Sequence, residues 1–83
     1  MLVSRADLAQ ACDLALSGQW EAAHAIVQRD EDDAASCWIH AVLHKIEGDD
    51  ANARYWYRQA SQFFEAYGDP AAELRAIKAT LIY

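Results

Sequence analysis

Two histidines four residues apart are the feature of this chain that is best suited to chemistry. His40 and His44 lie in a helix-forming stretch, so both rings leave the same face of the helix. Cys37 and Glu47 extend that face, and all of these side-chain types can bind zinc or another transition metal. One helix cannot bring the four together, because Cys37 and Glu47 would lie about 15 Å apart at 1.5 Å per residue. A metal site therefore needs a ligand from another element, and His24 is the one histidine left.

A second interpretation makes the same histidines structural. Buried histidines are usually hydrogen-bonded to neighbouring polar groups, and such groups follow closely in the sequence. We therefore favour a structural polar network over a metal site and expect no cofactor. The expected network consists of His40, His44, Glu47, Asn52 and Tyr57. The alternative is a metal or small-ligand site that uses His24, His40 and His44.

An aromatic triplet follows the histidines. Successive helical residues point about 100° apart, so Tyr55, Trp56 and Tyr57 cannot share one environment. Tyr57 fits the core, and we expect Trp56 to pack at a boundary with Phe63. Tyr55 then lies nearest to solvent. With its basic neighbours it could receive an acidic peptide or a second copy of the chain. The favoured alternative is that arginine stems cover the aromatic faces and pair with carboxylates. The basic neighbours are Arg54 and Arg58.

Local signals predict five helices that hold these residues. Ser4 is a good N-cap with Asp7 three residues later, and the first helix ends at Gly18. Trp20 opens a short second helix. The third runs from about Ala34 to Glu47 and ends at Gly48.

The fourth helix is expected to start after Asp49 and to continue to Gly68. Apolar residues recur along it at core-facing spacing, at Ala53, Tyr57, Ala60, Phe64 and Tyr67. Asp69 caps a fifth helix with Pro70 at its first position, where the missing N–H has no helical partner to lose.

An internal repeat relates the first two pairs of helices. Gly18 and Gly48 are 30 residues apart (48 − 18 = 30), and this alignment places Ala11 on Ala41 and Ala23 on Ala53. The pattern resembles the tetratricopeptide repeat, a helical hairpin with small residues where its helices touch. The resemblance implies one domain over residues 1–83, with hairpins at 4–33 and 34–67 and a capping helix at 68–83.

That resemblance also implies an interaction surface. Stacked hairpins form a concave side that binds partner proteins. Here it would be lined by Ala35, Trp38, Val42 and Lys45, with Trp38 as an exposed anchor. The central string HAVLHKIEGDDANARYWY is also similar to a signature of a small family of bacterial proteins for which no activity is established.

Composition narrows the range of functions. A formal net charge of −6 argues against nucleic acid and against anionic membranes as partners. No apolar run approaches the roughly 20 residues that span a bilayer. Cys12 and Cys37 read as buried thiols in a reducing cytoplasm. Enzyme motifs are absent. We therefore expect a non-catalytic, cytoplasmic module that binds a protein partner or associates with itself, for example as a homodimer.

Overall fold

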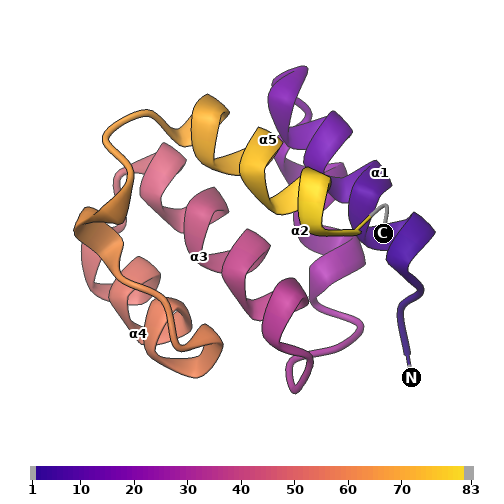
Figure 1. Cartoon of the computed structure of the whole chain (residues 1–83), viewed down its shortest axis with the longest axis horizontal. Coiled ribbons are helices and arrows are strands. Elements are labelled where there is room, and N and C mark those ends of the chain that lie inside the picture. The colour runs from indigo at the N-terminus through magenta and orange to yellow at the C-terminus, as the bar shows by residue number, and fades with distance from the viewer. Residues whose placement is uncertain (1, 82–83) are drawn as a thin grey trace.

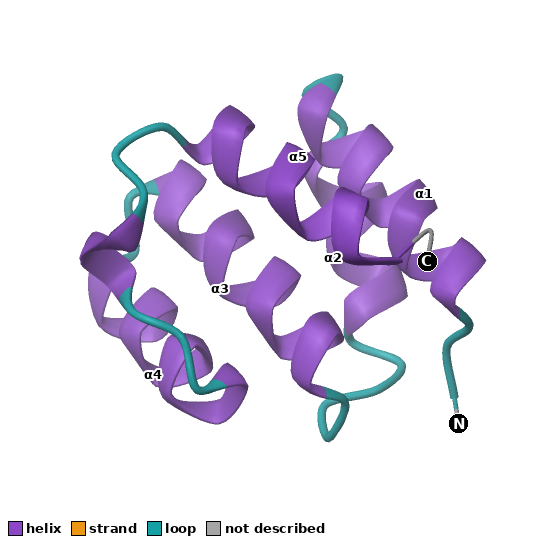
Figure 2. Cartoon of the chain, viewed as in Figure 1, coloured by secondary structure: helices purple, strands orange, loops and turns teal. Residues whose placement is uncertain are grey.

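The computed structural model describes residues 2–81 and is built from helices (Figure 1). No strand occurs in this part of the chain (Figure 2). The prediction of an all-α array of five helices is confirmed. Within residues 2–81, no helix is both long enough and apolar enough to cross a membrane. The helices are α1 (Arg5–Leu16), α2 (Trp20–Val27), α3 (Ala34–Glu47), α4 (Asp50–Ala60) and α5 (Pro70–Leu81), with a single 3-10 turn, η1 (Phe64–Ala66), before α5.

The third helix is the centre of the array. It packs against α4, the next helix along the chain, and also against α1, α2 and α5. The helix α5, yellow in Figure 1, returns across the molecule and lies against both α1 and α3. Small residues at the predicted repeat positions are fully buried, which lets neighbouring helix backbones approach closely. These residues are Ala11, Ala23, Ala41 and Ala53.

The helix ends follow the local signals. Ser4 and Asp7 form a reciprocal capping box, because each side chain accepts a hydrogen bond from the other residue's backbone N–H. Asp49 accepts from the backbone N–H of Asn52 and so caps α4. Gly48 ends α3 in the left-handed conformation, with φ of 86°, which glycine adopts without steric cost.

The end of α4 was predicted wrongly. The helix stops at Ala60 and does not continue to Gly68, because Ser61 takes the left-handed conformation with φ 56° and ψ 40°. The chain then turns into η1. Phe64 still reaches the core side, where its ring meets the edge of Tyr57 at 5.7 Å between centroids. Phe64 therefore packs on the core side as its apolar spacing predicted, although it lies outside the helix.

The expected concave surface is covered by α5. Val42 is fully buried, and Trp38 is half-buried with its indole N–H donating to Glu73 of α5. Lys45 lies 3.2 Å from the same carboxylate and donates to the carbonyl of Tyr67. The prediction that these three α3 residues form an open interaction surface was wrong, because the fifth helix fills the groove.

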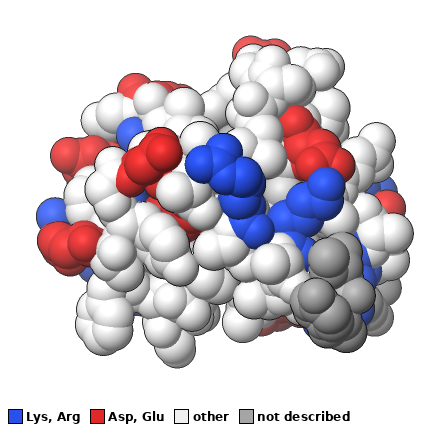
Figure 3. Space-filling model, turned by 45° about the horizontal axis from the view of Figure 1, so that its top comes forward, with Lys and Arg blue, Asp and Glu red and all other residues white. Residues whose placement is uncertain are grey.

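Charged side chains of both signs adjoin one another at the surface. On the face shown in Figure 3, basic groups lie next to acidic ones and do not form a patch of one sign. The pairs include Lys78 with Asp13 at 2.8 Å and Arg54 with Glu65 at 2.7 Å. Such exposed pairs contribute little to stability, about 0–1 kcal/mol each.

Candidate functional site

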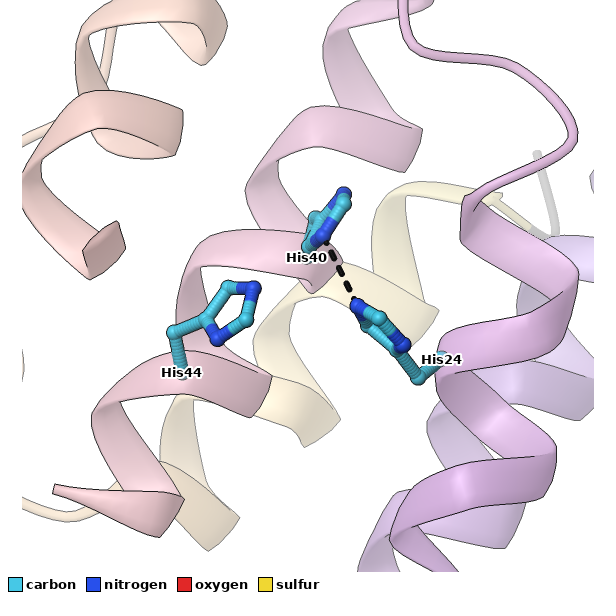
Figure 4. Close-up of side chains that lie close together, drawn as sticks. All are labelled: His24, His40 and His44. Atoms are coloured by element: carbon cyan, nitrogen blue, oxygen red, sulfur yellow. Dashed lines mark hydrogen bonds between the residues drawn. The ribbon is translucent and has the colours of Figure 1, made fainter. Parts of the chain in front are cut away.

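Three histidines from two helices converge between α2 and α3. His24 comes from α2, and His40 and His44 lie one turn apart on α3 (Figure 4). One ring nitrogen of each residue lies within 4.8 Å of those of the other two. The packing of α2 against α3 thus supplies the third histidine that a single helix could not.

The ring nitrogens face one another at short range. Nε2 of His24 and Nε2 of His40 are 3.1 Å apart, the distance of a hydrogen bond (Figure 4). The rings of His40 and His44 stack at 5.0 Å between centroids, and those of His24 and His44 meet edge-on at 5.3 Å. The three imidazoles therefore form one compact cluster.

Two tryptophans hold the cluster from either side. Trp20 stacks on His24 at 4.5 Å and donates its indole N–H to the backbone carbonyl of Leu43 at 2.6 Å. Trp56, from α4, stacks on His40 at 4.0 Å with the planes only 13° apart. Because each ring is packed against a large neighbour, the histidine orientations are restricted. Trp56 was expected to pack with Phe63, which is instead 75% exposed.

The outer nitrogen of His44 has a carboxylate partner. Nδ1 of His44 lies 2.7 Å from Glu47, so this nitrogen carries the proton that the carboxylate accepts. The lone pair of a neutral His44 is then on Nε2, which faces the other two rings (Figure 4). The side-chain amide of Asn52 lies 3.4 Å from that nitrogen. A carboxylate behind a histidine is the usual support of a metal-binding imidazole.

The inner histidine has an unsatisfied atom. His40 is 3% exposed, and its Nδ1 is buried without a hydrogen-bond partner. Burial, together with the neighbouring imidazoles, lowers the pKa of His40 to about 3. Burial also lowers the pKa of His24. Both rings are therefore neutral near pH 7, which is the form that binds metal.

The predicted structural network is divided between two places. His44, Glu47 and Asn52 lie together, as described above. His40 instead contacts His24 through the Nε2 atoms of the two rings. Tyr57 lies on the other side of α4, where its hydroxyl contacts Glu73 at 2.8 and 2.9 Å.

Cys37 does not belong to the cluster, since its thiol bonds the carbonyl of Glu31 at 3.2 Å. Burial raises the pKa of this thiol and keeps it protonated. Asp49 and Glu47 form a second possible ligand group with His44. Both carboxylates are exposed, and they already serve as the cap of α4 and the partner of His44.

The basic and aromatic patch of α4 remains at the surface. Tyr55 is 45% exposed and meets Trp56 edge-on. Arg54 covers the ring of Phe64 at 4.2 Å, as expected of an arginine stem over an aromatic face. Arg58 is exposed and lines a hollow of about 130 Å³ beside η1.

Together these features define an all-α protein with a three-histidine cluster between tryptophan walls. Comparison with protein-family models, with curated proteins and with solved structures finds no match to this chain. The function must therefore be inferred from the residues themselves.

Proposed function

We propose that the protein binds one first-row transition-metal ion, most readily zinc, through His24, His40 and His44. The observation that carries this proposal is the convergence of three imidazole nitrogens from two helices. Zinc–nitrogen bonds of about 2.0–2.1 Å place tetrahedral ligands about 3.3 Å apart. His24 and His40 are already 3.1 Å apart, so a small movement of His44 would complete the set.

The protonation of the cluster favours a cation over a purely structural role. The neutral rings of His24 and His40 direct Nε2 atoms toward each other, and His44 turns its outer nitrogen to Glu47 and its Nε2 toward this pair. One proton can join His24 to His40, but the lone pair of His44 then faces the pair with only a long contact to Asn52. A metal ion would accept all of the facing lone pairs at once.

The test is calorimetric titration of Zn²⁺ into protein purified without an affinity tag and stripped with a chelator. We expect one ion per chain and stabilisation by about 2.7 kcal/mol when free Zn²⁺ is 100 times the dissociation constant. His24→Phe keeps an aromatic ring beside Trp20 but removes one ligand. It should weaken binding more than about 100-fold, since even outer-shell partners are worth 10–100-fold.

The matched control is Asp49→Asn, which preserves the helix cap and removes one exposed carboxylate. Its affinity should equal that of the parent. A parent chain that takes up no Zn²⁺, or equal affinity in His24→Phe, would contradict the proposal. Weakening by Asp49→Asn alone would place the ion on the surface carboxylates.

We propose, as a second function, capture of an acidic segment of a partner protein at the hollow beside η1. Phe63 is the most exposed large apolar side chain of the described residues, and Arg58 lines the same hollow. An exposed aromatic with an adjacent cation suits a partner that carries carboxylates and apolar groups.

This second proposal predicts a charge effect that depends on position. A fluorescent peptide of alternating aspartate and leucine should bind the parent, and Arg58→Glu should weaken it about tenfold or more. Arg29→Glu makes the same charge change at an exposed position on another helix end. Equal weakening by both variants would show a general charge effect and no specific surface. Anisotropy titration at two salt concentrations measures this.

A further inference from the structure

We infer that the metal ion keeps an open fourth position, taken by water or a small monoanion that receives a hydrogen bond from Asn52. This inference rests on the proposed function. Three protein nitrogens leave one tetrahedral position for a ligand from solution, the arrangement of catalytic rather than structural zinc sites.

Among residues 2–81, no fourth histidine, cysteine, aspartate or glutamate joins the cluster. The group that can close on one ion contains the three histidines alone. The carboxylate of Glu47 contacts the outer nitrogen of His44, and the thiol of Cys37 donates to the carbonyl of Glu31. A structural zinc site would have a fourth side chain in place.

Asn52 is placed to contact a ligand in that position. Its side-chain nitrogen lies 3.4 Å from Nε2 of His44, the atom that would bind the metal. The first turn of α4 is fixed by Asp49, which accepts from the backbone N–H of Asn52. An amide N–H beside the metal can donate to an oxygen or nitrogen of the incoming ligand.

The cluster is also partly exposed to solvent on the side of His24 and Asn52. His40 and His44 are buried, whereas His24 and Asn52 are only half-buried. The tryptophans that flank the rings, Trp20 and Trp56, are half-buried as well. A ligand can therefore enter past His24 and Asn52. With the metal as the local positive charge, the open position suits a ligand as small as water, azide or formate.

Cobalt substitution tests this inference, because the visible spectrum of Co²⁺ reports the number and type of its ligands. The zinc-free protein is loaded with Co²⁺ and titrated with azide. We expect saturable change in the visible bands of the parent at one Co²⁺ per chain. Asn52→Leu should bind Co²⁺ nearly as well but azide about tenfold more weakly, the value of one lost hydrogen bond. Gln59→Leu removes an amide from an exposed position of α4 and should behave as the parent.

The possible failures are distinguishable. Absence of any Co²⁺ uptake would remove the proposed function and this inference together. Co²⁺ uptake with a spectrum that azide leaves unchanged would show a closed site and would overturn only the inference. Azide binding of equal strength in the parent and in Asn52→Leu would leave the open position but exclude the role of Asn52. Because the azide titration of the parent uses the unmutated protein, this part of the test does not depend on whether a variant folds.

Discussion

Replacing Glu73 with alanine should destabilise the protein by about 3–5 kcal/mol, the loss typical of removing one partner from a buried ion pair. The side chain of Glu73 is 0% exposed and lies at the junction of three helices. It accepts from the indole of Trp38 at 2.9 Å and the hydroxyl of Tyr57 at 2.8 Å, and Lys45 is 3.2 Å away. Alanine would leave the indole of Trp38 and the hydroxyl of Tyr57 without this acceptor, and Lys45 would keep only the carbonyl of Tyr67.

Urea denaturation monitored by circular dichroism measures the loss. Glu73→Gln keeps the shape and one acceptor oxygen, so it should be less harmful than alanine. Glu65→Ala removes an exposed glutamate that pairs with Arg54, and it should change the free energy of unfolding by no more than about 1 kcal/mol. If the free energy of unfolding of Glu73→Ala is within about 1 kcal/mol of that of the parent, the carboxylate does not hold the helices together. A typical domain has only 5–15 kcal/mol to lose.

The metal-free protein should lose stability as the pH falls from about 6.5 to about 3. The pKa of His40 is lowered from 6.5 to about 3 in the folded chain, mainly by burial. The unfolded chain therefore binds a proton in this window that the folded chain does not. The contribution of His40 is complete above pH 6.5 and is lost on acidification. At about 1.4 kcal/mol per pKa unit, this contribution is on the order of 5 kcal/mol.

His40→Phe isolates this effect from the carboxylates. Phenylalanine can keep the stacking on Trp56 but cannot titrate. Asp7 and Glu65, whose pKa values are lowered by hydrogen bonds, also destabilise the fold when they protonate, but they do so equally in both proteins. The free energies of unfolding of the parent and of His40→Phe are measured by denaturation from pH 7 to pH 4. The parent should lose stability relative to His40→Phe steadily as the pH falls. A constant difference would show that His40 titrates normally.

The helices were predictable because their start and stop signals are local. Ser4 with Asp7, Gly48 and Pro70 each act within one turn of the residue that carries them. The end of α4 had no such signal, since Ser61 adopts a conformation that glycine or asparagine usually marks. The position of α5 depends on contacts with α1 and α3, which no local pattern encodes.

The site was predictable only in part, for the same reason. Helical periodicity placed His40 and His44 on one face, but the approach of His24 depends on how α2 packs. The burial of Glu73 was missed although a signal existed. Glu73 is four residues before Ile77 and eight before Leu81, on the buried face of α5, and a charged residue in such a stripe needs buried partners.

The return of α5 across α3 has a consequence for synthesis of the chain. Trp38 and Lys45 leave the ribosome 35 and 28 residues before Glu73. Until that residue emerges, the donors on α3 and the apolar face beneath α5 have no cover. Completion of the fold therefore waits for α5, and until then the earlier helices expose apolar surface, which makes partly folded chains prone to aggregation.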